Sequence, residues 1–203
     1  NWHIQRFDHQ IVAGNNSGTR IIDGLTSEMI AHQQNTSSTC MRQYHSESGE
    51  NYLIESGYGM LTVYEKRGGR WQFRNTVQGF VEPVQQFEID ARGVIWATHL
   101  SRGVYRVELS GDLRSAIKVQ SYTQLGHDEA NSQIHVMKIR GDLVLSDGNN
   151  LYTPTSSGHF TAVQALSAFA HETILSATAV DNYHYWLSTV KGYMYIEYHA
   201  GRY

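Results

Sequence analysis

Residues 94–107 read Val94-Ile-Trp-Ala-Thr-His-Leu-Ser-Arg-Gly-Val-Tyr-Arg-Val107. An apolar run, a short turn with a glycine and a second run rich in branched and aromatic residues are typical of a β-hairpin. The pattern recurs at intervals of 41 to 47 residues, with the turn position occupied by Gly18, Gly59, Gly103, Asn150 and Gly192. A repeat of about 40–50 residues with four short strands is the signature of a β-propeller blade.

Two other series of turns share this period. One contains Asp90-Ala-Arg-Gly93 and Asp181-Asn-Tyr-His184, and the other contains Asp23-Gly24 and Gly68-Gly69. Gly and Asn recur in such turns because they adopt a positive φ at low cost, so we expect positive φ at the turn positions.

The runs between the turns predict strands. The second run of each repeat, such as Leu143-Val-Leu145, is short and continuously apolar, which is expected of an inner strand buried on both faces. In the next run, Met60, Thr62 and Tyr64 alternate with Leu61, Val63 and Glu65, and we expect the two sets to lie on opposite faces. One short helical turn is expected within residues 164–174.

The sequence therefore predicts an all-β fold, a β-propeller of about five four-stranded blades. The blades are expected at about residues 1–35, 36–78, 79–122, 123–166 and 167–203, within a single propeller segment. The fifth repeat has no run for an outer strand, which favours five consecutive blades of a larger propeller, most simply one of seven. The alternative is a compact five-bladed ring.

Composition excludes several classes of protein. The 203 residues include 16 basic and 19 acidic side chains, a net charge of −3, so no basic face for nucleic acid is expected. Cys40 is the single cysteine, which rules out an intramolecular disulfide. No run of 18 apolar residues predicts a membrane span. We expect no cofactor and no membrane contact by this segment.

The stretch from Gly93 to Val107 resembles the regulator-propeller repeat of the periplasmic sensor regions of Bacteroides-type hybrid two-component systems. The family pattern is Gly-x-Ile-Trp-x-Gly-Thr, a short turn, and Gly-Leu-Tyr-Arg-Tyr. The residues that match it are Gly93, Ile95, Trp96, Thr98, Gly103, Tyr105 and Arg106. Residues 185–195 and 143–152 are weaker copies.

This resemblance implies a periplasmic domain that senses a ligand, usually a glycan fragment, and that is not itself an enzyme. It also implies a parent protein that continues into an immunoglobulin-like spacer, a membrane helix, a histidine kinase and an AraC-type output domain. The expected partners are therefore an oligosaccharide and a second copy of the chain, through a homodimer of the parent protein.

Ligands of propellers bind where the loops between the second and third strands converge with the loops that join successive blades. Polar side chains and a tyrosine in these loops would hydrogen-bond to a carbohydrate and stack on it. Ordinary solvated turn residues are the alternative reading of each position. The candidates are Asn15, Asn16, Tyr58, His99, Arg102, His127, Asp128, Asp147, Asn149 and Lys191.

The sequence gives only weak indications of sugar stacking by tryptophan, of zinc binding or of a serine nucleophile. Trp96 and Trp186 occupy the same repeat position, where packing between blades is the favoured role and stacking on sugar the alternative. The eleven histidines lack the spacing of a zinc site. Ser115-Ala-Ile-Lys118 matches Ser-x-x-Lys but falls on an expected strand, whereas that nucleophile needs a helix N-terminus.

Two other functions stay open. A five-bladed glycosidase or a lectin is one, although the repeat-related acids Asp8, Asp90 and Asp181 fall at the wrong end of the inner strands for catalysis. Asp128, Glu129, Asp147 and Glu172 remain candidates for such an enzyme. A rigid scaffold for protein interaction is the other.

Overall fold

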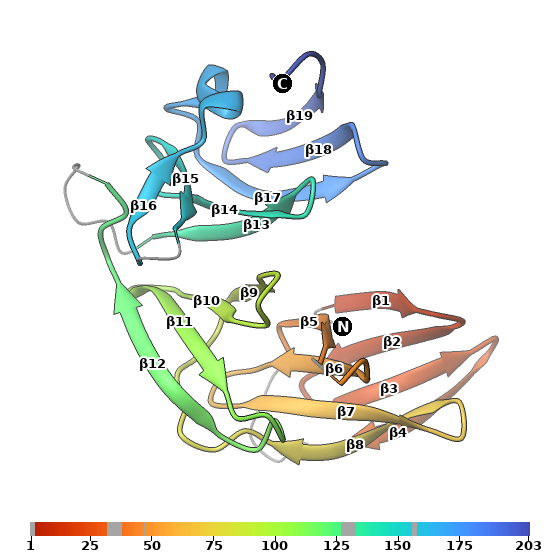
Figure 1. Cartoon of the computed structure of the whole chain (residues 1–203). Coiled ribbons are helices and arrows are strands. Elements are labelled where there is room, and N and C mark those ends of the chain that lie inside the picture. The colour runs from red at the N-terminus through yellow and green to blue at the C-terminus, as the bar shows by residue number, and fades with distance from the viewer. Residues whose placement is uncertain (1–2, 32–37, 47, 127–132, 156–157) are drawn as a thin grey trace. The chain divides into compact units, whose positions relative to one another are not determined.

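The computed structural model describes residues 3–31, 38–46, 48–126, 133–155 and 158–203. In this part of the chain, nineteen strands form five antiparallel sheets, and in each sheet consecutive strands lie side by side (Figure 1). Four sheets have four strands, and the sheet nearest the C-terminus has three. Four-stranded meanders are the blades of a β-propeller. The predicted all-β propeller fold is therefore confirmed, while membership of a larger propeller stays a prediction.

The chain divides into two compact units, residues 1–95 with 106–120, and residues 96–105 with 121–203. The first unit holds two complete sheets. Their strands are β1 (His3–Phe7), β2 (Gln10–Asn15), β3 (Gly18–Asp23), β4 (Thr26–Ala31), β5 (Cys40–His45), β6 (Asn51–Ser56), β7 (Leu61–Arg67) and β8 (Arg70–Thr76).

The core of the first unit lies between these two sheets. It contains one large aromatic side chain from β7, Tyr64, and one from β8, Trp71, which are 0% and 1% exposed. Aliphatic side chains of β2, β3 and β6 pack against them, namely Val12, Ile21 and Leu53. Face-to-face burial of this kind supplies most of the stability of sheets that have two apolar faces.

The third sheet has strands in both units, and the second unit holds the last two sheets. A 3-10 helix, η1, follows β16 within the segment where a helical turn was expected, and its Leu166 packs into the core of this unit. No helix among the described residues is long and apolar enough to cross a bilayer. The elements are β9 (Gln86–Ile89), β10 (Ile95–His99), β11 (Gly103–Leu109), β12 (Ala116–Tyr122), β13 (His135–Ile139), β14 (Asp142–Ser146), β15 (Leu151–Pro154), β16 (Phe160–Ala162), η1 (Gln164–Phe169), β17 (Ile174–Ala179), β18 (His184–Thr189) and β19 (Gly192–Glu197).

One prediction about strand burial is wrong in part. Residues 61–64 of β7 are all buried, so both of the alternating sets are shielded from solvent, and Tyr64 packs in the core of the first unit. On β18, Trp186 is 47% exposed, so the expected burial on both faces fails there. Its ring contacts Tyr195 of β19, at 5.1 Å between centroids. Trp96, by contrast, is 1% exposed and has the expected packing role.

The turn positions also differ from expectation in two repeats. Positive φ occurs at Gly18, Gly103 and Gly192, as predicted, but not at Gly59 or Asn150. In the fourth repeat the left-handed residue is Gly148, because the turn there is closed by the side chain of Asp147. Asn150 still has the register position of Gly18 and Gly192, because its carbonyl accepts from the N–H of Asp147 at 3.4 Å, three residues earlier, as Gly18 pairs with Asn15 and Gly192 with Thr189.

Gly103 has a second constraint besides its φ of 76°. A Cβ at this position would lie 2.1 Å from the carbonyl oxygen of Tyr122, so the backbone of β12 leaves no room for a side chain. We expect Gly103→Ala to lower the free energy of unfolding by about 2 kcal/mol or more, from backbone strain and this clash.

Urea denaturation measures this change, with Gly111→Ala as the matched control. Gly111 has no positive φ, and nothing lies within 4 Å of a Cβ there, so its substitution should be neutral or slightly stabilising. Equal losses in the two variants would contradict the prediction.

Candidate functional site

The structure places the predicted ligand-binding residues in or beside the expected turns. Asn15 is the last residue of β2, Asn16 lies in the β2–β3 turn and Tyr58 in the β6–β7 turn, all in the first unit. In the second unit, His99 is the last residue of β10, and the β10–β11, β14–β15 and β18–β19 turns hold Arg102, Asp147, Asn149 and Lys191. His127 and Asp128 lie outside the described residues. That these residues bind a ligand stays a prediction.

Three of these side chains stabilise their own turns. The Asn15 Oδ1 accepts a hydrogen bond from the backbone N–H of Ser17 at 2.8 Å, and the His99 Nδ1 accepts one from Ser101 at 3.0 Å. The Asp147 Oδ1 accepts from the backbone N–H groups of residues 149 and 150, at 2.9 and 2.8 Å. In three repeats, the first side chain of the turn thus accepts hydrogen bonds from the backbone of its own turn.

One segment between blades brings two of the predicted turns together. The N–H of His171 donates to the carbonyl of Asn149 at 2.6 Å, and the N–H of Val190 donates to the carbonyl of Thr173 at 3.3 Å. The Lys191 Nζ lies 3.0 Å from the Glu172 Oε1. Residues 171–173 therefore connect the β14–β15 turn to the β18–β19 turn.

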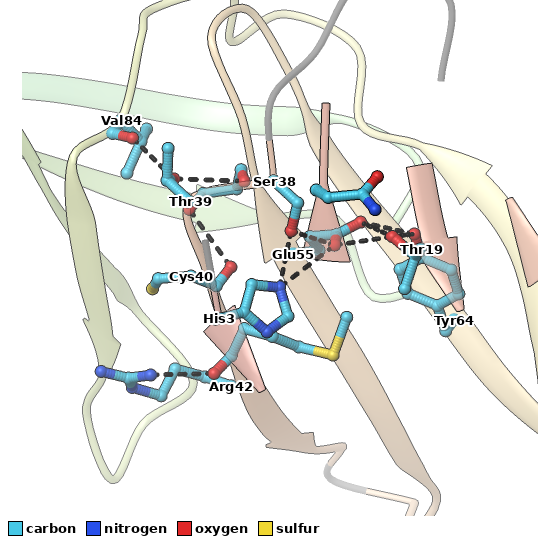
Figure 2. A network of polar contacts seen from close by, with 12 residues as sticks. His3, Thr19, Ser38, Thr39, Cys40, Arg42, Glu55, Tyr64 and Val84 are labelled. Atoms are coloured by element: carbon cyan, nitrogen blue, oxygen red, sulfur yellow. Dashed lines mark hydrogen bonds and ion pairs between the residues drawn. The ribbon is translucent and has the colours of Figure 1, made fainter. Parts of the chain in front are cut away.

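A buried carboxylate in the first unit was not predicted. Glu55, near the end of β6, is 1% exposed. The Thr19 Oγ1 lies 2.7 Å from both of its oxygens, the Tyr64 hydroxyl donates to Oε2 at 2.5 Å, and Ser38 donates to Oε1. The His3 Nε2 lies 3.3 Å from Oε1 (Figure 2). The carboxylate thus joins the first sheet to the second.

Gly14 makes room for this cluster. A Cβ at that position would lie 2.0 Å from the Ser38 Oγ and 2.4 Å from the His3 Nε2. Burial alone would raise the pKa of Glu55, but the hydrogen bonds from His3, Ser38, Tyr64 and Thr19 outweigh it and hold the pKa below its usual value. Because four side chains surround a carboxylate that solvent hardly reaches, its role in this conformation is to hold two sheets together.

The second unit contains a groove of about 910 Å³, large enough for an oligosaccharide fragment. It is formed by the end of β12 and the residues that follow it, by the start of β15, and by β16 with the first residue of η1. The lining residues are 122, 124–126, 150, 152, 158–162 and 164. The groove adjoins the β14–β15 turn, because Asn150 lines it.

Aromatic side chains form one wall of this groove. The rings of Tyr122 and Phe160 are perpendicular, with an interplanar angle of 85° and 5.1 Å between centroids. Trp96 packs against both, at 6.0 Å from Tyr122 and 5.9 Å from Phe160. Because Trp96 is fixed in the core, the two half-buried rings in front of it have defined orientations.

Sequence reasoning missed the groove for a local reason. Tyr122 and Phe160 are on the outer strands β12 and β16, which carry no repeated sequence motif, whereas the predicted site residues are all in or beside loops. Two signals were present in the sequence, namely the aromatic residues at these strand ends and Gly126. A Cβ at Gly126 would lie 2.4 Å from the Tyr152 hydroxyl, so a glycine is needed where this chain segment passes Tyr152.

The acids considered for catalysis do not form a pair at the groove. Asp147 is 5% exposed and bonded within its turn, and Glu172 pairs with Lys191. Asp128 and Glu129 lie outside the described residues. Ser115 and Lys118 are on or beside β12, at its N-terminal end, not at a helix N-terminus. Among the residues that the structure describes, no three His, Cys, Asp or Glu side chains gather in a way that would hold a metal ion.

Comparison with known proteins identifies the fold. No family model matches the chain, and no curated protein matches it in sequence. The Dos1 propeller is similar over 96% of this chain, with a TM-score of 0.60 and 11% identity, and the chain spans 56% of that protein.

Two other solved structures come from different functional classes. One is the extracellular domain of BT3049 from B. thetaiotaomicron, described as a hybrid two-component system, with a TM-score of 0.60, 14% identity, 98% of this chain covered and 28% of that one. The other is an engineered GH43 glycoside hydrolase, with a TM-score of 0.54, 12% identity, 96% of this chain covered and 49% of that one. At such identities the similarity shows the propeller fold alone.

The buried carboxylate leads to a stability prediction. We expect Glu55→Gln to lower the free energy of unfolding by about 3 kcal/mol, because an amide of the same size leaves donors facing an NH₂ group. Urea denaturation at pH 7 measures this, with Glu28→Gln as the control. Glu28 is 61% exposed and pairs with Arg70 at the surface, so its loss should cost under about 1 kcal/mol. Similar losses in both variants would contradict the structural role of Glu55.

The lowered pKa of Glu55 gives the sign of its pH dependence. Its contribution to stability is fully present above the unfolded pKa of about 4.3 and is lost as the pH falls through the lower folded pKa. The difference in unfolding free energy between wild type and Glu55→Gln should therefore shrink as the pH is lowered from 7 to values below the unfolded pKa. Urea titrations across this interval test it. A difference that stays constant would mean that packing, and not charge, is responsible.

Proposed function

We propose that this chain is a ligand-sensing propeller segment of an extracytoplasmic sensor of the two-component type, and that it recognises a glycan without catalysing a reaction. The repeat around Trp96 supports the sensor class, and extracellular domains of hybrid two-component systems share the fold. The proposed location is the periplasm, as part of a membrane-anchored parent protein that dimerises.

The observation that carries this proposal is the groove beside β12 and β16. Its lining combines the aromatic side chains Tyr122, Tyr152 and Phe160 with the amides of Gln124, Asn150 and Gln164. Aromatic faces pack against the C–H faces of sugar rings, and amides hydrogen-bond to hydroxyls. Glycoside hydrolysis needs a pair of carboxylates flanking the bond, and no Asp or Glu is among the described lining residues. Recognition therefore fits the groove better than hydrolysis.

Sensing requires that the ligand bind one state of the parent protein more tightly than another. The groove is connected to the rest of its unit through η1, which begins at Gln164 and whose Ala165 carbonyl accepts a hydrogen bond from the N–H of Tyr203 at 3.2 Å. A ligand that contacts Gln164 would thus contact η1, which packs in the core of this unit.

Calorimetry against a panel of oligosaccharides tests the proposal. We expect one of them to bind with a micromolar dissociation constant, and Phe160→Ala to weaken it about 3- to 10-fold through loss of stacking. Phe73→Ala, at a 47% exposed aromatic residue of β8 outside this groove, is the matched control and should bind normally. Circular dichroism should show that both variants are folded.

Two results would contradict the proposal. One is the absence of heat with every oligosaccharide, together with a stable dimer in solution, which would favour an interaction scaffold. The other is the release of reducing ends from a bound oligosaccharide, which would favour a glycosidase.

A further inference from the structure

The described lining of the groove contains aromatic, amide and hydroxyl side chains but no residue with a permanent charge. The twelve described residues of the lining include no Asp, Glu, Lys or Arg. In the whole chain, by comparison, 16 basic and 19 acidic residues are present among 203. From this we infer that the ligand is a neutral oligosaccharide, and that glycans with carboxylate or sulfate groups are excluded; this inference rests on the proposed function.

Desolvation is the physical reason for the exclusion. An anionic sugar that enters the groove would lose water around its charge, and binding restores that loss only where Arg, Lys or several backbone N–H groups face the anion. Neither Arg nor Lys is among the described lining residues. In the adjoining turn, the carboxylate of Asp147 is 5% exposed and would repel an anion at Asn150.

Neutral hydroxyls match what the groove offers. Each amide carries both a donor and an acceptor, as each sugar hydroxyl does, so Gln124, Asn150 and Gln164 can bind either orientation of an O–H group. Thr161 adds a hydroxyl on the exposed side of β16. These groups cost less to desolvate than charged groups, which suits an uncharged ligand.

The aromatic wall adds selectivity for a ring with an apolar face. Tyr122 and Phe160 meet at 85°, so a sugar packed on one ring has the edge of the other beside it. Trp96 packs behind both rings, so they are ordered before the ligand arrives and little side-chain entropy is lost on binding. Stacking requires an accessible C–H face of the sugar ring. Neutral pyranosides have such a face, whereas the sulfate groups of densely sulfated sugars obstruct it.

Titration calorimetry with two panels of equal chain length tests the inference. One panel contains neutral xylo-, manno-, gluco- and galacto-oligosaccharides, and the other contains oligogalacturonides and sulfated oligosaccharides. We expect a neutral member to bind at least about tenfold more tightly than any acidic member, and Phe160→Ala to weaken it.

A charge-introducing variant makes the test sharper. Thr161 is exposed on an edge strand, where a lysine is well tolerated, so Thr161→Lys should fold normally. It should raise the affinity for acidic oligosaccharides at least about fivefold, in a manner that salt suppresses. The control is Thr178→Lys, at an exposed position of β17 outside the groove, and it should change nothing.

The outcomes separate the two proposals. If acidic oligosaccharides bind the wild type as tightly as neutral ones, and this binding is lost in Phe160→Ala, the assignment of a neutral ligand is overturned. The proposed sensor function would then still stand. An affinity for acidic oligosaccharides that does not rise in Thr161→Lys would overturn the assignment of the ligand to this groove. Binding of neither panel would overturn the proposed function itself, and the inference with it.

Discussion

The inner strands of the central sheets have two apolar faces and can bury them only against other sheets. The central strands illustrate this constraint, because β10 and β14 are buried along nearly their whole length and leave no face for water. A single four-stranded sheet of this kind would expose both faces, so no blade is stable alone and neighbouring blades form each core together. The strand lengths, the tight turns and the absence of long helices among the described residues all follow from this requirement.

The Glu55 cluster is a buried polar site beside the apolar core that lies between the first two sheets. A buried carboxylate contributes little to net stability compared with an apolar residue of the same size, but it is specific, because its oxygens accept only from correctly placed donors. His3, Thr19 and Tyr64 come from three strands of two sheets, so the cluster forms only when the register and the relative position of these two sheets are right. The cluster therefore specifies how the two sheets align, in addition to any contribution to the free energy of their association.

Much of the fold was predictable, because turns and inner strands follow rules that are local. Three features have a physical cause within a few residues. They are the glycine in the turn at Gly103, the hydrogen bonds by which Asp90 closes its own turn, and apolar runs such as 143–145. The exceptions arose where side chains changed the local rule, as at Asp147, whose hydrogen bonds shift the left-handed residue to Gly148. Local rules do not predict how the groove and the Glu55 cluster assemble, because they join residues 38 and 52 positions apart on strands that carry no common motif.

Trp96 belongs both to the repeat and to the groove. It is the aromatic residue that identifies the repeat, it is 1% exposed, and it sets the orientation of the two rings that form the groove wall. Substitution of Trp96 would disturb the core, whereas Gln124, Thr161 and Gln164 are exposed and their substitution would not. Related chains can therefore be expected to diversify their ligands through the amides and hydroxyls at the edge of the groove, while the aromatic wall changes slowly because the fold itself depends on it.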